Sequence, residues 1–373
     1  VFNHTGRKSV YFNADGFYDD LGAAQGPDSP YYSWYSFHPF PDDYDAWWGI
    51  KNLPAVNETE ESYVDYIIEG EHAIIRRWLR AGASGWRLDV ADELPDGFIA
   101  RIRRAIEEET PDGYLLGEVW EDGTTKIAYS KRRKYLLGRE THGLMNYPFR
   151  TALLDFLRGG DAAVFRERME ELREHYPAPA YYGAMNFLST HDTPRLLTLL
   201  GHEGDAPATR DERAAYRLSE EELVRGTTLL KLAALILYTF PGSPMLYYGD
   251  EAGMQGFEDP FNRGPYPWGH EDAALLRYFR QLGALRKAHE ALQRGTIDYC
   301  AAQGRVLAFR RASNSEKCIT AVNAGEQSAA LTLPWDAPLA QDALTRQSFF
   351  CGDGLLRLTL EPYGAVLLVE PEN

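Results

Sequence analysis

The chain has 373 residues, of which 44% are hydrophobic and 25% are charged, as in an ordinary soluble globular protein. A chain of this length buries a large core and is expected to hold one large domain and a smaller one. Its formal net charge of −16 argues against a nucleic-acid partner, because no basic tract is present to neutralise phosphates, and it disfavours binding to an anionic membrane surface.

The first segment after the start of the chain is irregular. Residues 5–58 contain few helical patterns and many Tyr, Trp, Asp, Gly and Pro residues. Long irregular segments of this kind commonly carry function, so this one is predicted to be a loop domain inserted into the fold.

The middle of the chain alternates between helix-like and strand-like segments. Helical periodicity or a long apolar run predicts helices over 63–81, 96–109, 229–240 and 271–289. Short apolar runs that end in polar or charged residues predict strands over 85–89, 114–118, 143–146, 185–190 and 244–248. This alternation indicates a parallel α/β architecture. Chemistry-bearing side chains at the strand ends favour a (β/α)8 barrel over an open sheet.

The pattern changes after about residue 292. Strand-like runs then follow one another between turn residues, at 306–312, 318–324, 329–334 and 365–370. They predict an antiparallel β-sandwich at the C-terminal end. The three cysteines all lie in this part of the chain and lack a C-x-x-C spacing, which favours free thiols in a reducing compartment.

Arg87 and Asp89 end the predicted strand 85–89. Successive side chains of a strand alternate, so both residues lie on the same face, where the guanidinium would keep the aspartate ionised and oriented. A carboxylate nucleophile needs both conditions. Taken alone, however, an Arg-x-Asp pair is more typical of a buried structural ion pair.

Three further segments place functional side chains at strand ends. Glu118 ends the next strand and stands beside Trp120, an apolar setting that raises the pKa of a carboxyl as a general acid requires. His191 and Asp192 end a later run, and His4 stands near the start of the chain. Two carboxyls in different surroundings form the pair expected of glycoside hydrolysis. Each group taken alone is better explained as a hydrogen-bonded barrel residue.

Together these segments resemble the α-amylase family of retaining α-glucosidases and glucanotransferases. VFNHTG is similar to the end of the family's first motif, and GWRLDVADE, GEVWED and FLSTHDTPR are similar to the second, third and fourth. LPAVN stands where the family has its fifth motif, and PGSPMLYYGDEAGMQG with DPFNRGPYPW resembles the loop after its last barrel strand. The resemblance covers essentially the whole chain, and the VADE and WWG segments are most similar to the neopullulanase and cyclomaltodextrinase branch.

The resemblance implies a catalytic role for three carboxyls. Asp89 would be the nucleophile, Glu118 the general acid/base, and Asp192 a third carboxylate that grips the sugar hydroxyls at C2 and C3. Arg87 would keep Asp89 ionised. The implied reaction is a double displacement, for which the carboxyl groups of Asp89 and Glu118 should lie about 5–5.5 Å apart.

The same resemblance implies the contacts with substrate. His4 and His191 would hydrogen-bond sugar hydroxyls at the cleavage subsite, and Trp47, Trp48 and Trp120 would stack on glucose rings, with a structural role equally open for at least one tryptophan. The implied substrates are maltooligosaccharides, cyclodextrins, pullulan or starch, cleaved at α-1,4 bonds, with α-1,6 bonds as a further candidate. We expect a cytoplasmic protein with no nucleic-acid or membrane partner, and a homodimer stays open for the full-length protein.

No cofactor is expected, and calcium is the alternative. Asn3 corresponds to a calcium ligand in some relatives, and Asp15, Asp19 and Asp20 lie nearby in the chain, but the EF-hand spacing is absent. Solvated loop carboxylates are the favoured interpretation. Asp250 is interpreted as part of the loop structure.

The chain departs from the family at its front. In the family, an aspartate, two whole barrel strands and most of a third precede Val-Phe-Asn-His, and they are absent here. We therefore interpret residues 1–4 as the remnant of barrel strand three, 5–58 as the inserted domain, 59–291 as barrel strands four to eight, and 292–373 as the sandwich. An incomplete barrel exposes open edges, so the isolated chain is expected to be poorly stable and weakly active or inactive.

Two classes of function stay open. The first is an active glycoside hydrolase or transglycosylase that acts on α-glucans. The second is a catalytically incompetent fragment or a non-enzymatic, amylase-like carbohydrate-binding protein. Relatives of the second kind usually lose a catalytic carboxylate, whereas Asp89, Glu118 and Asp192 are all present, which favours descent from an active enzyme.

Overall fold

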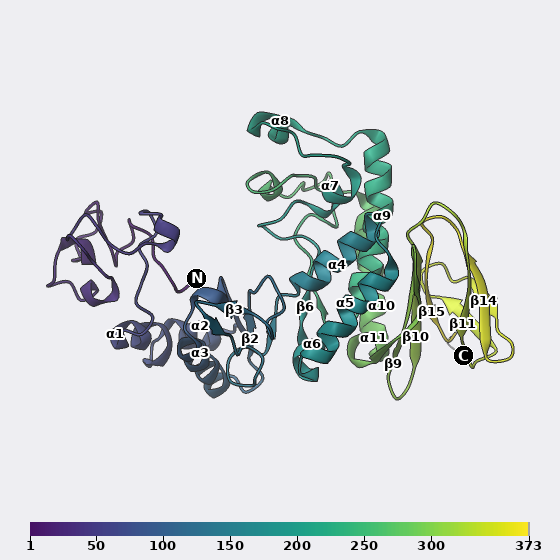
Figure 1. The fold of residues 1–373 in the computed structure, drawn as a ribbon, viewed down its shortest axis with the longest axis horizontal. Coiled ribbons are helices and arrows are strands. Elements are labelled where there is room, and N and C mark those ends of the chain that lie inside the picture. The colour runs from purple at the N-terminus through teal and green to yellow at the C-terminus, as the bar shows by residue number, and fades with distance from the viewer. Residues whose placement is uncertain (372–373) are drawn as a thin grey trace. The chain divides into compact units, whose positions relative to one another are not determined.

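The computed structural model describes residues 1–371 (Figure 1). The chain divides into two compact units, and the boundary along the sequence lies between Met145 and Asn146. The first unit contains the irregular segment and three parallel strands, and the second contains most of the helices and the C-terminal sheets. No helix in this described part of the chain is long and apolar enough to cross a membrane.

Residues 5–58 are irregular, as predicted, and they pack around aromatic rings. The segment contains the short 3₁₀ helices η1 (Ala23–Gln25), η2 (Tyr32–Trp34) and η3 (Trp47–Gly49). Phe12 is fully buried, with the rings of Tyr35 and Tyr44 at centroid distances of 4.9 and 4.7 Å. Aromatic packing of this kind supplies the apolar burial that the segment needs in place of regular secondary structure.

The predicted helix over 63–81 is interrupted. The chain forms α1 (Glu61–Val64), a π-helical turn η4 (Asp65–Glu69) and α2 (Ile74–Arg80). The break follows Gly70, whose N–H bonds to the carbonyl of Asp65 at 2.9 Å and whose missing Cβ would lie 2.9 Å from that oxygen. The apolar stripe survives the break, because Ile68, Ile75 and Leu79 remain buried.

Three parallel strands follow, in the spatial order β1, β2, β5. They are β1 (Gly85–Leu88), β2 (Tyr114–Gly117) and β5 (Gly143–Leu144), with η5 (Ala91–Glu93) and α3 (Asp96–Glu109) between the first two and the short hairpin β3 (Ile127–Ala128) and β4 (Lys131–Arg132) before the third. Leu88 lies opposite Gly117. The parallel pairing therefore brings the residues after β1 and β2 to the same edge of the sheet.

The second unit continues the alternation of helices and short parallel strands. Its elements before residue 296 are α4 (Tyr147–Leu157), α5 (Ala162–His175), α6 (Ala178–Gly183), β6 (Met185–Asn186), α7 (Leu196–Gly201), α8 (Arg210–Ala215), α9 (Glu220–Thr239), β7 (Ser243–Pro244), η6 (Phe261–Arg263), α10 (Ala273–Ala288) and α11 (Glu290–Arg294). β6 and β7 pair in parallel. All five predicted barrel strands are thus present and parallel to their partners, but β6 and β7 are shorter than predicted.

Two antiparallel sheets form the C-terminal part, as predicted. Their strands are β8 (Thr296–Gln303), β9 (Val306–Ala312), β10 (Lys317–Asn323), β11 (Ala329–Pro334), β12 (Leu339–Asp342), β13 (Ser348–Phe350), β14 (Leu355–Leu360) and β15 (Ala365–Val369). Six of them form one sheet in the order β13, β12, β15, β10, β9, β8, and β11 pairs with β14 in a second. The parallel strands with helices and this sandwich agree with the predicted fold class.

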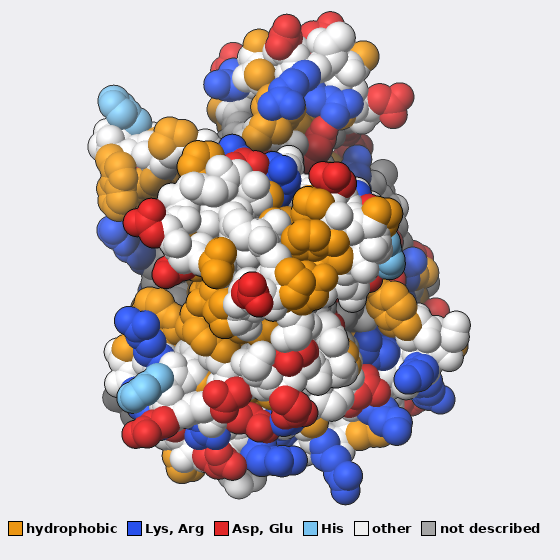
Figure 2. Space-filling view, turned by 90° about the vertical axis from the view of Figure 1, so that its left-hand side faces the viewer, with side chains coloured by type: hydrophobic (Ala, Val, Ile, Leu, Met, Phe, Trp, Pro, Cys, Tyr) orange, Lys and Arg blue, Asp and Glu red, His pale blue; other side chains and the backbone are white. Residues whose placement is uncertain are grey.

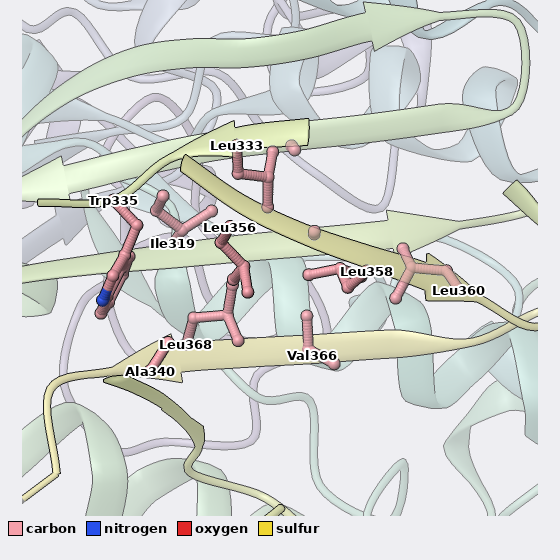
Figure 3. Close-up of a cluster of buried hydrophobic side chains, with 11 residues drawn as sticks. Ile319, Leu333, Trp335, Ala340, Leu356, Leu358, Leu360, Val366 and Leu368 are labelled. Atoms are coloured by element: carbon pink, nitrogen blue, oxygen red, sulfur yellow. The ribbon is translucent and has the colours of Figure 1, made fainter. Parts of the chain in front are cut away.

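The side chains between the two C-terminal sheets form one apolar cluster (Figure 3). Leu333 and Leu356 from the two-stranded sheet pack with Ile319 and Leu368 from the six-stranded sheet, and all four are fully buried. Trp335 closes the cluster and donates its indole N–H to the carbonyl of Leu339 at 3.1 Å. Alternating buried and exposed residues along β14 show why one face alone joins this core.

Charged side chains of both signs share the surface. Figure 2 shows Asp and Glu side chains interspersed with Lys and Arg, with hydrophobic side chains gathered between them. The cysteines Cys300, Cys318 and Cys351 are free, in agreement with the sequence prediction.

The C-terminal core predicts the effect of truncating one side chain. Leu356→Ala should lower the free energy of unfolding by about 2–5 kcal/mol, because it leaves a cavity between the sheets. Arg357→Ala, on the exposed face of the same strand, should change it by less than about 0.5 kcal/mol. Guanidinium unfolding followed by circular dichroism measures both. Equal losses for the two variants would contradict this account of the core.

Candidate active site

Asp89 and Glu118 share one guanidinium. Arg87, at the end of β1, donates an Nη1 hydrogen bond to Asp89 Oδ1, and its Nη2 lies 3.0 Å from Glu118 Oε2. Glu118 directly follows β2, and its backbone N–H bonds to the carbonyl of Leu88 at 2.9 Å. The two carboxyls therefore meet because β1 and β2 are parallel neighbours in register.

The turn after β1 holds the Glu118 carboxylate from the backbone. Val90 donates its N–H to Glu118 Oε2 at 2.8 Å, and Ala91 donates to the carbonyl of Glu118 at 3.2 Å. Val90 adopts φ 41° and ψ 56°, in the left-handed region that a β-branched residue rarely occupies. Such a conformation costs on the order of 1–3 kcal/mol, and strain of this kind clusters at functional sites.

Glu118 is more polar in its surroundings than the sequence indicated. It is 4% exposed, but Trp120 donates its indole N–H to Oε1 at 3.2 Å, while Arg87 and the Val90 N–H face Oε2. Trp120 stands beside the carboxyl, as predicted from the sequence, but it contributes a donor as well as an apolar face. The carboxyl is buried and oriented through both of its oxygens.

The surroundings of Asp89 favour its ionised form. Burial alone would raise the pKa of this carboxyl, but the hydrogen bond and the charge of Arg87, with a hydrogen bond to the Glu118 side chain, outweigh burial and lower the pKa below its usual value. About a third of the Asp89 side chain is exposed. An ionised, partly accessible carboxylate fixed by a guanidinium meets the requirements of a nucleophile.

An aromatic stack lies at the N-terminal end of the same unit. The ring of His4 stacks on Trp47 at a centroid distance of 4.9 Å, and Trp47 stacks on Trp48 at 4.7 Å. Trp48 is 74% exposed and donates its indole N–H to Glu93 at 3.0 Å. Burial lowers the pKa of His4, which favours the neutral imidazole, and its Nδ1 bonds to Asn3 Oδ1 at 2.9 Å, so Nε2 is the nitrogen that can accept a bond from a ligand.

The second unit holds His191 and Asp192. His191 Nε2 lies 3.2 Å from Asp192 Oδ2, and Arg263 approaches the other oxygen of Asp192 at 3.4 Å. Arg263 also donates to the carbonyl of His191 at 3.1 Å. Asp192 is thus oriented by an imidazole and a guanidinium, and both it and His191 remain partly exposed.

Three buried residues that sequence analysis did not single out as site residues support this loop. Asn262 donates its side-chain amide N–H to the carbonyls of His191 and Thr193, both at 2.8 Å, and its backbone carbonyl accepts from Arg195 Nε at 2.8 Å. Arg195 pairs with Asp250 at 3.5 Å. The motifs that contain Arg195, Asp250 and Asn262 were visible in the sequence, but no spacing rule indicated that they meet. Asp250 forms part of the loop structure, as the sequence analysis predicted.

The structure brings the predicted site residues together in three groups. In the first unit these groups are the stack of His4, Trp47 and Trp48, and the cluster of Arg87, Asp89, Glu118 and Trp120; in the second unit the group is His191 with Asp192. Glu93 also belongs to this site, although the sequence analysis did not name it. It could have been found from its position in the VADE segment that resembles the family. The hydrogen bond between Trp48 and Glu93 connects the stack to the loop after Asp89.

Asp15 does not fit a calcium site. Its two carboxylate oxygens face Arg7 at 2.6 Å and Lys8 at 3.8 Å, and these cations occupy the positions that a metal ion would need. The Asn3 side chain interacts with His4 Nδ1 at 2.9 Å. Asp15 and Asn3 are therefore paired with neighbouring side chains, and the expectation that no cofactor is needed stays a prediction.

The burial of Asp250 predicts a pH-dependent stability. Burial raises the pKa of Asp250 to about 6, although Ser189 and Arg195 oppose it. Because the folded state then binds this proton more tightly than the unfolded state, the contribution of Asp250 to stability falls as the pH rises from about 4 to about 6. The wild-type free energy of unfolding, relative to that of Asp250→Asn, should fall by up to about 1.4 kcal/mol per pH unit over this range.

Urea unfolding of both proteins between pH 4 and 7 measures this difference. Glu251→Gln removes a neighbouring charge that helps to raise the pKa of Asp250, so this variant should show a weaker pH dependence than wild type. A difference between wild type and Asp250→Asn that is constant or rises with pH would contradict the account.

Two family models match the chain. The alpha amylase catalytic domain matches residues 1–266, and the maltogenic amylase C-terminal domain matches residues 301–367. An amylopullulanase of Thermoanaerobacterium saccharolyticum is 36% identical over 83% of this chain and 25% of its own length. A cyclomaltodextrinase of Geobacillus thermopakistaniensis is 32% identical over 98% of this chain and 58% of its own length.

Solved structures show the same similarity. The debranching enzyme from Nostoc punctiforme superposes with a TM-score of 0.79 at 28% identity, over 99% of this chain and 75% of that one. The chain thus spans between a quarter and three fifths of the two relatives named above. Because the catalytic-domain model covers well over half of the chain, the chain belongs to the α-amylase family.

Proposed function

We propose that this chain carries the catalytic groups of a retaining α-glucan hydrolase. The observation that carries the proposal is the shared guanidinium of Arg87, which contacts both Asp89 and Glu118 at the ends of neighbouring parallel strands. Two of the relatives are named amylopullulanase and cyclomaltodextrinase. We propose maltooligosaccharides, cyclodextrins, pullulan or starch as substrates, cleaved at α-1,4 and also at α-1,6 bonds.

Asp89 attacks the anomeric carbon in the first step. Its lowered pKa keeps it ionised, and the hydrogen bond from Arg87 fixes the orientation of the attacking oxygen. The new bond joins Asp89 to the sugar while the glycosidic bond breaks, so a covalent glycosyl-enzyme forms. The charge lost from Asp89 appears on Glu118 once it has given up its proton, and Arg87 Nη2 lies 3.0 Å from Glu118 Oε2 to face that charge.

Glu118 supplies the proton in that step. It donates a proton to the leaving oxygen and then, as the carboxylate, removes a proton from the water or acceptor sugar that resolves the intermediate. The Trp120 indole and the Val90 N–H bond to the two carboxyl oxygens, so they hold the group in place in both protonation states. All proton transfer uses side chains of the chain, and we propose no cofactor.

The remaining groups bind the sugar. We propose that His4 and His191 bond to hydroxyls at the cleavage subsite, that Asp192 accepts bonds from the hydroxyls at C2 and C3, and that the exposed ring of Trp48 stacks on a neighbouring glucose. The stacking partner Trp47 and the bond to Glu93 orient the Trp48 ring for such a contact. We further propose a cytoplasmic location and an α-glucan as the principal partner.

Removal of the nucleophile tests the proposed chemistry. Asp89→Asn should lower kcat/KM on maltotriose by more than about 10³-fold, because the amide does not attack the anomeric carbon. Asp112→Asn, an exposed carboxyl in the turn before β2, should keep the wild-type value. Reducing-sugar release measures both rates. Equal turnover by wild type and Asp89→Asn would overturn the proposal, whereas a folded wild type that binds maltotriose without turnover would favour the carbohydrate-binding alternative.

The pH profile tests the role of Arg87. Arg87→Met removes the interaction that lowers the pKa of Asp89, so the acid limb of kcat/KM should move to higher pH in this variant. The sign follows because Asp89 must be ionised to attack. Initial rates between pH 3 and 8 measure the limb. An unchanged limb with a uniform loss of rate would show that Arg87 serves the fold without tuning Asp89.

A further inference from the structure

Two cavities in the second unit merge into one groove. Their volumes are about 710 and about 810 Å³, and both are lined by Glu203, Arg225, Glu326 and Tyr363. We call this depression the α9 groove, because one wall is the first half of α9 and the other is formed by the turns that end β10 and β14. Each volume lies within the range of small-molecule sites.

The floor of the groove is held by Arg305. Its guanidinium donates to the carbonyls of Gly160 at 2.8 Å and Leu157 at 2.9 Å, next to α4, and to that of Ala324 at 2.7 Å, after β10. One side chain thereby ties α4 to the turn of the sandwich. A floor fixed in this way is formed before any ligand arrives, which lowers the entropic cost of binding.

Tyr363 presents an aromatic ring at the rim of the groove. It adopts φ 55°, in the left-handed region that favours glycine, and the residue after it is Gly364. Its N–H bonds to the carbonyl of Gly325 at 3.1 Å, and its hydroxyl lies 3.5 Å from Glu326. A tyrosine at a backbone position that suits glycine indicates that its ring contacts a ligand, since strained residues cluster at binding sites.

The charged groups of the groove select a neutral ligand. Four carboxylates line the groove, from Glu203, Glu220, Glu221 and Glu326. Three guanidinium groups, from Arg158, Arg225 and Arg305, nearly balance them, so the lining favours neither an anion nor a cation. Arg225 pairs with Glu203 at 2.9 Å. Carboxylates accept and guanidinium groups donate hydrogen bonds, so the lining matches the paired hydroxyls of a sugar, and Tyr363 adds a face for stacking.

We propose that the α9 groove binds a neutral α-glucan chain, separately from the groups that cleave it. None of the proposed catalytic carboxyls Asp89, Glu118 and Asp192 lines the groove. The choice of α-glucan as the ligand rests on the proposed function of this chain. The groove would hold a long glucan near the enzyme and thereby favour long substrates over short ones.

Affinity electrophoresis of the full chain in gels that contain soluble starch tests the proposal. Tyr363→Gly removes the ring while it suits the backbone at φ 55°, so the fold is not put at risk. The apparent Kd for starch should rise about three- to tenfold in this variant. Tyr363→Phe, which keeps the ring, and Phe350→Ala, which removes an aromatic side chain that is 90% exposed elsewhere in the sandwich, should migrate like wild type.

Turnover of p-nitrophenyl α-maltoside separates the groove from the catalytic groups. Tyr363→Gly should leave kcat/KM on this short substrate unchanged. Equal retardation of Tyr363→Gly and wild type, or an equal loss of short-substrate turnover and retardation, would overturn the groove and leave the proposed function standing. Retardation that depends on Tyr363 in a chain that cleaves neither substrate would support the groove and count against the proposed function.

Discussion

One guanidinium between two carboxyls is the constraint on which the site depends. Two ionised carboxyls placed close together repel each other. Arg87 faces both Asp89 and Glu118, and its hydrogen bond and charge lower the pKa of Asp89, the more exposed of the two. The arrangement requires parallel β1 and β2 in register, and it requires the left-handed turn at Val90 that returns an N–H to Glu118. The strand pairing and the strained turn thus serve the same pair of groups.

In the second unit, too, single arginine side chains connect groups from separate segments of the chain. Arg195 is fully buried, pairs with Asp250, and joins it to the backbone around Asn262, which in turn holds the loop of His191 and Asp192. Arg305 ties α4 to the sandwich through backbone carbonyls. Guanidinium groups reach several acceptors in a fixed plane, which explains why they join segments that are distant in the sequence. Polar groups therefore organise the loops around apolar cores formed by helices and sheets.

Periodicity and strand-end chemistry predicted much of this molecule. The helix at 96–109 and the strand at 306–312 were found at the predicted residues, because their apolar spacing is regular. The break after Gly70 was missed, since the apolar stripe continues across it. The strands β8, β12, β13 and β14 were not predicted, and for β12 and β13 the reason is that runs of three or four residues carry too little pattern.

The site, too, could be predicted only in part from the sequence. Charged residues at strand ends are visible in sequence, and they led to Asp89 and Glu118. The donors around Glu118 depend on the backbone angles of Val90 and on a tryptophan ring turned toward the carboxyl, and no spacing rule encodes either. The stack of His4 on Trp47 joins residues 43 positions apart, so only the fold reveals it.

Mass spectrometry of the chain after incubation with a 2-deoxy-2-fluoro-α-maltosyl fluoride tests the central claim most directly. The fluorine slows breakdown of the covalent intermediate, so the trapped sugar marks the nucleophile. The account predicts one adduct per chain, on the peptide that contains Asp89, and no adduct in Asp89→Asn. A folded chain without an adduct, or an adduct on another carboxyl, would contradict it.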